Sequence, residues 1–178
     1  MWNFNMKINR FFPVFTALSL LVLPACFHDN DNKSDFTEWR NENLEYINRI
    51  AELTEDGKAV YSPITPEWDN SFTIYMRWHN DGEENPSDIM PLSNSICHVK
   101  YTLRNIDGEP LDSSASFTCV PNNMVTGFMT ALTNMKVNDT VTAVIPYTAG
   151  YGSYSYGAVL PYSTLIFGIR LDSISKLM

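Results

Sequence analysis

The sequence predicts an α+β domain in which several antiparallel strands carry one short helix on one face of their sheet. Residues 96–104 and 111–120 form two extended stretches separated by a turn. Residues 140–145 and 163–172 alternate between apolar and other side chains, as half-buried strands do. The short apolar stretch 124–132 has the length of a helix of about two turns. We expect this helix to pack on one face of the sheet.

The N-terminus has the layout of a secretory signal. Lys7 and Arg10 precede an apolar run over residues 11–23, which is too short for an ordinary transmembrane helix. The run ends in Leu-Pro-Ala-Cys26, which resembles a bacterial lipoprotein box, and this resemblance implies that Cys26 is acylated. The alternatives are an uncleaved anchor or a plain signal in which Cys26 is incidental. Residues 26–35 are polar and acidic, as expected of a solvated tether.

An amphipathic helix is expected after the tether, over residues 36–57. Asp35 and Glu38 have the spacing of a capping box, and Gly57 is a plausible stop. Apolar residues recur near helical spacing at Phe36, Trp39, Leu44, Tyr46, Ile47, Ile50 and Leu53. This stripe is interpreted as a face docked on the domain, with a partner-binding face as the alternative.

The remaining domain is expected to cover residues 58–178. Residues 71–78 alternate as a strand, and residues 80–95 form a polar loop rich in turn residues. Asp107-Gly108 lies between the two extended stretches that follow, and this dipeptide is a strong hairpin signal.

Residues 146–161 contain four tyrosines and no periodic pattern. A loop of this length in a compact domain is usually functional or disordered, and disordered segments are poor in aromatic residues. We interpret the segment as an ordered aromatic flap over a pocket. The alternative is a surface loop whose tyrosines merely pack on a sheet.

Charge and cysteine content exclude several classes of function. The formal net charge of -8 disfavours nucleic acid as a partner, because affinity for phosphate comes mainly from clustered Lys and Arg. Cys97 and Cys119 are too few for a disulfide framework and are expected to be buried free thiols. The three histidines lack the spacing of metal ligands, so no metal and no cofactor is expected. Ser153 and Ser155 lack the flanking glycines of a nucleophile elbow.

The stretch 99–114, V-K-Y-T-L-R-N-I-D-G-E-P-L-D-S-S, resembles the pattern V-x-Y-x-x-x-x-x-D-G-x-x-F-D-S-S of FKBP-type peptidyl-prolyl isomerases. Matching pieces continue in order to Leu160-Pro161 and Phe167, so the similarity covers residues 96–174. The helix that begins near Trp39 is also similar to the lead-in of lipoprotein members of that family. The resemblance implies an FKBP-like fold, a twisted antiparallel sheet wrapped around the short helix, with an aromatic pocket that receives a proline.

The resemblance also implies site residues. The expected catalytic residues are Tyr101, Asp112, Tyr151 and Phe167, and the expected substrate-binding residues are Leu111, Met124, Val125, Phe128 and Val159. Four positions depart from the family pattern, and one of them is Leu160-Pro161, which stands where a double proline is common. Phe128 replaces the usual Trp of the pocket floor, Leu111 replaces a Phe, and the segment between Ser114 and Phe117 is shortened, which is expected to remove a pocket aromatic.

The resulting hypothesis is a lipid-anchored prolyl isomerase of the bacterial cell envelope, on the periplasmic or the surface face of the outer membrane, acting on Xaa-Pro bonds of exported proteins. Asp112 would orient Tyr101, Tyr151 would bond a substrate carbonyl, and the rings would hold the proline. The first alternative is a non-catalytic FKBP-like lipoprotein that binds proline-containing or unfolded chains. A second alternative is a surface receptor that uses the loop 80–95. For Asp112 the alternative role is a turn residue that caps the two serines after it.

Overall fold

The computed structural model describes residues 35–79 and 85–175. The predicted signal, Cys26 and most of the predicted tether lie outside these residues. From Asp35 onward the chain forms one compact unit. Its main feature is a six-stranded sheet in the order β3-β4-β7-β8-β5-β6, in which every neighbouring pair is antiparallel. The FKBP-like α+β architecture expected from the sequence is confirmed.

The strands of the large sheet follow the period-2 pattern of the sequence. They are β3 (Ser62–Ile64), β4 (Ile74–Trp78), β5 (Ile96–Arg104), β6 (Pro110–Cys119), β7 (Thr140–Ile145) and β8 (Leu165–Ser175). β5 and β7 have the predicted bounds, whereas β4 begins three residues later than expected and β8 extends to Ser175. The β5–β6 hairpin turns at Gly108, whose φ of 81° lies in the left-handed region. The side chain of Asn105 accepts hydrogen bonds from the N–H groups of Asp107 and Glu109, which fixes this turn.

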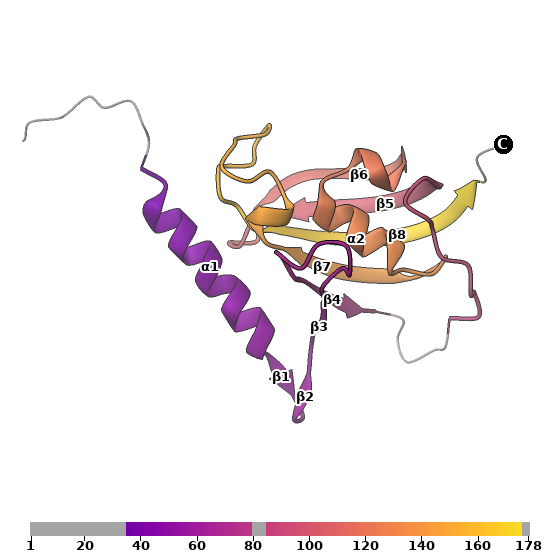
Figure 1. Ribbon diagram of the computed structural model, residues 1–178, viewed down its shortest axis with the longest axis horizontal. Helices are drawn as coiled ribbons and strands as arrows, with labels where there is room; N and C mark the ends of the chain where they lie inside the picture. The colour runs from indigo at the N-terminus through magenta and orange to yellow at the C-terminus, as the bar shows by residue number, and fades with distance from the viewer. Residues whose placement is uncertain (1–34, 80–84, 176–178) are drawn as a thin grey trace, which may run out of the picture. The chain divides into compact units, whose positions relative to one another are not determined.

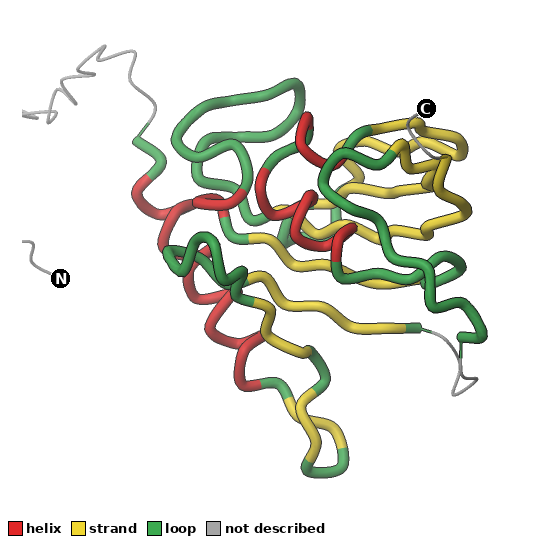
Figure 2. The backbone as a smooth tube through the Cα atoms, turned by 45° about the vertical axis from the view of Figure 1, so that its right-hand side comes forward, coloured by secondary structure: helices red, strands yellow, loops and turns green. Residues whose placement is uncertain are grey.

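One short helix covers one face of the sheet, as Figures 1 and 2 show. We call this face, which carries the apolar core, the inner face. This helix is α2 (Thr126–Thr133), which follows the short 3-10 turn η1 (Pro121–Asn123). Phe128 and Leu132 of α2 are buried in the main apolar core, which also contains Val141 of β7 and Ile169 of β8. At Gly127 a Cβ would collide with Ile145, so glycine permits the close approach of α2 to β7.

The N-terminal helix α1 (Thr37–Glu52) is shorter than predicted. Asp35 accepts a hydrogen bond from the Thr37 N–H at 3.0 Å, but the N-cap position is Phe36, whose ring cannot accept a hydrogen bond. The prediction that Gly57 ends the helix is wrong. Asp56 and Gly57 have φ values of 50° and 74° and form the tight turn of a small hairpin, β1 (Thr54–Glu55) and β2 (Lys58–Ala59).

α1 is docked on the rest of the domain chiefly through polar side chains. Asn43 is fully buried and accepts a 2.6 Å hydrogen bond from the N–H of Thr164, while Trp39 donates to Ser163 at 3.1 Å. Of the predicted apolar stripe, Ile50 is buried, whereas Leu44 and Leu53 each remain 42 % exposed. The stripe is therefore only partly a docked face. Within residues 35–79 and 85–175, no helix has the length and apolar character needed to cross a bilayer.

Candidate functional site

Three aromatic rings from three elements meet on the inner face of the sheet. Phe128 of α2 and Phe167 of β8 have ring centroids 4.9 Å apart, and Tyr101 of β5 lies 6.4 Å from Phe128 and 6.0 Å from Phe167. All three contacts are edge-to-face, with interplanar angles of 61° to 79°. We call these three rings the aromatic cluster. Phe128 and Phe167 are buried, whereas Tyr101 is only half-buried.

The hydroxyl of Tyr101 donates a 2.7 Å hydrogen bond to Oδ2 of Asp112, which is exposed on the edge strand β6. The β5–β6 register sets this contact, because Leu103 pairs with Asp112 and Tyr101 pairs with Ser114, so all four side chains share a face. The other carboxylate oxygen of Asp112 accepts a 2.8 Å hydrogen bond from the N–H of Ser113. Asp112 thus makes both the hydrogen bond to Tyr101 that was expected of it and a local bond to the first of the two serines, as its alternative role requires.

The tyrosine hydroxyls near Asp112 keep their protons far above neutral pH. Burial, followed by the hydrogen bond to Asp112 and the charge of that carboxylate, raises the pKa of Tyr101 to about 12. Burial is also the main cause that raises the pKa of Tyr151, followed by the phenol of Tyr156 and the carboxylate of Asp112. Tyr151 and Tyr101 are both packed against the same apolar core. At neutral pH both hydroxyls are therefore protonated, and the proton of Tyr101 is donated to Asp112.

The remaining predicted site residues belong to the same apolar region. Val159 is buried in the core, and Leu111, Met124 and Val125 are half-buried against it. Met124 and Val125 lie between η1 and α2, with Val125 at the N-cap of α2. The structure therefore brings the three rings into contact with one another and Asp112 into contact with Tyr101, while the aliphatic residues lie in or against the same core.

Sequence reasoning missed two rings. The first is Phe117, which follows the shortened segment of β6 and was not among the predicted site residues; its ring packs edge-to-face on Tyr101 with centroids 5.3 Å apart. Phe117 shares a face with Val99, its register partner, and bulges in β6 hide that alternation in the sequence. The second missed ring is Tyr156, which stacks on Tyr151.

The flap is ordered, as predicted. It begins at the 3-10 turn η2 (Tyr147–Ala149), and the N–H of Tyr162 at its end donates to the carbonyl of Gly152 at 2.8 Å. Its tyrosines divide into two groups. Tyr151 is half-buried beside the site, whereas Tyr154 is 76 % exposed.

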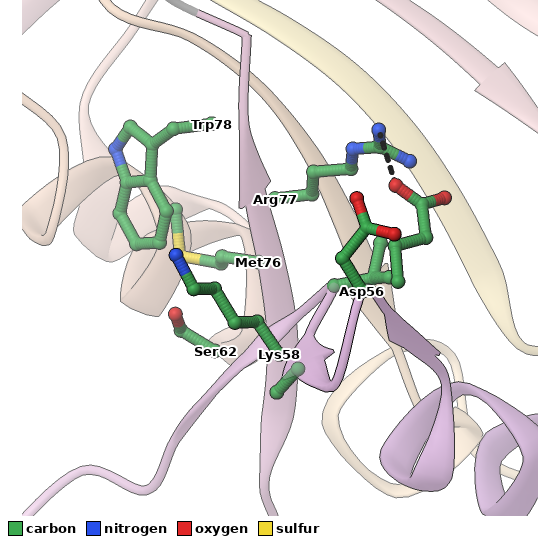
Figure 3. A pocket seen from close by; sticks show the side chains of 9 residues that line it. Asp56, Lys58, Ser62, Met76, Arg77 and Trp78 are labelled. Carbon is green, nitrogen blue, oxygen red and sulfur yellow. Dashed lines mark ion pairs between the residues drawn. The ribbon is translucent and has the colours of Figure 1, made fainter. Parts of the chain in front are cut away.

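A separate cavity of about 390 Å³ lies between the β1–β2 hairpin and β4 (Figure 3). Charged side chains line much of it, and Arg77 and Glu55 form an ion pair of 3.5 Å there. Its lining contains neither histidine nor cysteine. Across the described part of the chain, no three His, Cys, Asp or Glu side chains are arranged to hold a metal ion.

Comparison with known proteins places these observations in a family. Residues 88–172 match the family model described as FKBP-type peptidyl-prolyl cis-trans isomerase. The chain is 37 % identical over 89 residues to a macrophage infectivity potentiator of Trypanosoma cruzi, covering 47 % of this chain and 45 % of that protein. It is 35 % identical over 108 residues to the FKBP-type 22 kDa peptidyl-prolyl cis-trans isomerase of Escherichia coli K12, covering 57 % of this chain and 50 % of that protein.

A solved structure agrees with the sequence comparisons. The peptidyl-prolyl cis-trans isomerase of Pseudomonas syringae pv. tomato superposes with a TM-score of 0.61 at 25 % identity, over 79 % of this chain and 96 % of that chain. The chain spans about half the length of the curated relatives that it matches. Residues 88–172 are therefore identified as an FKBP-type peptidyl-prolyl cis-trans isomerase domain, and the fold agrees with this match.

Proposed function

We propose that this domain catalyses cis–trans isomerisation of Xaa-Pro bonds, and that its substrates are proline-containing segments of exported polypeptides. The observation that carries the proposal is the 2.7 Å hydrogen bond between Tyr101 and Asp112, formed at the edge of an aromatic cluster. The cluster supplies an apolar surface for a pyrrolidine ring, and the pair places a carboxylate beside it that the Tyr101 hydroxyl holds by a hydrogen bond.

The chemistry requires no bond to be broken and therefore no nucleophile or metal. Rotation about an Xaa-Pro amide must overcome roughly 18–20 kcal/mol of resonance, and unaided it takes tens to hundreds of seconds. In the twisted state the carbonyl and the nitrogen are decoupled and the amide is less polar. A site that binds the twisted form better than the planar form lowers the barrier, and a 10⁶-fold acceleration requires about 8 kcal/mol of such preference.

Each contact has a role in that preference. Phe128 and Phe167 would hold the proline ring away from water, together with Val125. Tyr151 would donate a hydrogen bond to a substrate carbonyl, and its raised pKa keeps the proton available throughout the physiological range. Asp112 would hold the Tyr101 hydroxyl in place and present negative charge near the rotating carbonyl carbon. These groups are fixed before the substrate binds, so the reaction does not have to reorganise them.

The test is exchange spectroscopy of an Xaa-Pro peptide with the full chain, its Asp112→Ala variant and its Asp107→Ala variant. Asp107 lies in the β5–β6 turn, outside the aromatic cluster, and serves as the matched control. A hydrogen bond to a charged group contributes about 1.5–3 kcal/mol, so Asp112→Ala is expected to lower the exchange rate about ten- to hundredfold. Asp107→Ala should leave it unchanged. Peptide exchange that is no faster with the full chain than without protein would refute the isomerase.

The second candidate is a non-catalytic module that binds proline-containing or unfolded chains with the same cluster. The observation that favours it is Phe128, a ring smaller than the Trp that the family resemblance leads one to expect on the pocket floor, packed tightly against Phe167. Peptide binding that shifts the resonances of the cluster without accelerating exchange would select this candidate over the enzyme.

We propose further that Cys26 is acylated and anchors the protein in the bacterial cell envelope, at the outer membrane. Support comes from the sequence alone: the positive and apolar segments that precede Cys26 and the acidic residues that follow it. Export would bring the domain to newly translocated chains. Incorporation of an alkyne-tagged fatty acid, lost in Cys26→Ser, tests the anchor. Digestion of the domain by protease added to intact cells would assign the surface face, and protection would assign the periplasmic face.

A further inference from the structure

Tyr156 has an unusual position for a ring that is 64 % exposed. Its plane is only 8° from that of Tyr151, and the two ring centroids are 4.5 Å apart. The contacts within the aromatic cluster, in contrast, are edge-to-face. An exposed ring gains little from burial, so the close parallel stack needs another cause.

The backbone of the flap supplies this cause. The N–H of Tyr156 donates to the carbonyl of Val159 at 3.0 Å, and the N–H of Val159 donates back to the carbonyl of Tyr156 at 2.9 Å. Gly157 turns the chain between them at a φ of 57°, a conformation that glycine adopts readily. The Val159 side chain is buried in the core. The small bridge therefore anchors the backbone from which the ring of Tyr156 stacks on Tyr151.

The ring of Tyr156 also acts electrostatically on the site. It contributes to the upward shift of the pKa of Tyr151, second to burial, and is the last of the causes that raise the pKa of Tyr101. The effect on Tyr151 agrees with the stacking geometry, in which the centroids of the two rings lie 4.5 Å apart.

We propose that Tyr156 is a positioning residue, which acts by holding the ring of Tyr151 in the orientation that directs its hydroxyl to the substrate carbonyl. This inference rests on the proposed isomerase function and adds a residue to its site. Tyr156 restricts Tyr151 from its outer side, while the core restricts it from the inner side. Without the stack, Tyr151 gains rotational freedom and presents its hydroxyl less often in the productive orientation.

The test compares Tyr156→Ala and Tyr156→Phe in the full chain, with Tyr154→Ala as a matched control. Tyr154 belongs to the same loop, and its side chain is even more exposed. An aromatic stack of this kind is worth a factor of about two to ten, so Tyr156→Ala should lower kcat/KM for an Xaa-Pro peptide by that amount. Tyr156→Phe should restore the rate because it keeps the ring, and Tyr154→Ala should match the parent chain.

A second readout does not depend on catalysis. With ring-labelled tyrosine, the resonances of Tyr151 should shift in Tyr156→Ala, and the pKa of Tyr151 should move toward its ordinary value. If the parent chain accelerates no exchange, the proposed function fails but this readout still judges Tyr156. Unchanged Tyr151 resonances in Tyr156→Ala would overturn the inference, as would equal losses of activity in Tyr156→Ala and Tyr154→Ala.

Discussion

Replacing Asn43 by Ala is expected to destabilise the domain, because this side chain joins α1 to the start of β8. Asn43 is fully buried, donates to the carbonyl of Trp39 at 2.7 Å and accepts from the N–H of Thr164 at 2.6 Å. Thr164 is also fully buried, and its hydroxyl donates to the main-chain carbonyl of Asn43 at 3.4 Å. The amide side chain is therefore the acceptor for a backbone N–H in a place from which water is excluded.

The size of the destabilisation follows from the buried N–H of Thr164. Asn43→Ala removes its acceptor, and a buried donor left without one costs about 1–3 kcal/mol of unfolding free energy. For a chain of this size the loss corresponds to a decrease in Tm of about 2–10 °C. Alanine has the higher helix propensity, which offsets a few tenths of a kcal/mol of the loss. Asn48→Ala, an exposed position on the same helix, has the same propensity gain and is the matched control.

The assay is urea and thermal unfolding of the parent chain and the two variants, followed by circular dichroism. We expect Asn43→Ala to unfold at lower urea and lower temperature than Asn48→Ala. If the two variants are equally stable, the docking of α1 through Asn43 contributes nothing and the reasoning is refuted.

Three further predictions concern the core and the site. Gly127→Ala should cost about 1–3 kcal/mol in urea unfolding, since the added Cβ collides with a side chain of β7; unchanged stability would contradict this close packing. Burial raises the pKa of Cys97 to about 11 and that of Cys119 to about 12, so in a Cys26→Ser background neither should react with a thiol reagent at pH 8 until the protein unfolds. Because folding raises the pKa of Tyr101 from 10 to about 12, the native state retains a proton that the unfolded chain releases, and stability should fall as pH rises above about 10. Tyr101→Phe should reduce this fall between pH 9 and 11 in urea titrations, and an unaltered slope would argue against the assigned pKa.

The parts of the fold that the sequence predicts are those in which local pattern and burial agree. The bounds of β5 and β7 follow from their side-chain alternation, because each strand has one face on the core. The β5–β6 hairpin is also predicted, because the Asp107-Gly108 turn signal lies between two long strands.

The β1–β2 hairpin shows the limit of this approach. Its strands have two residues each, all exposed, so no alternation marks them, and Gly57 was interpreted as the end of the preceding helix. Strand β3 contains Pro63, which the sequence presents as a break, yet a proline is tolerated in an edge strand. In both places the strands are short and mostly exposed, so too few side chains alternate between apolar and polar for the strand to be recognised from the sequence.

The candidate site likewise contains residues that the sequence predicts and residues that it does not. Tyr101, Asp112 and Phe167 were found through a resemblance, and the structure brings them together through strand register. Phe117 and Tyr156 were missed because their positions depend on a bulge and on a loop bridge, which are tertiary features. The buried contact of Asn43 was missed for the same reason. A polar residue on a surface helix is ordinarily expected to face water, and only the tertiary structure shows that Asn43 is buried.

The most direct test of the central claim is to locate a bound proline. Nuclear Overhauser contacts should be measured between an Xaa-Pro peptide, labelled in its proline ring, and the full chain. The aromatic cluster predicts contacts from the ring protons of the proline to Phe128 and Phe167, and their loss in Phe167→Ala. Contacts confined to the cavity between the β1–β2 hairpin and β4, or proline contacts that persist in Phe167→Ala, would contradict the account.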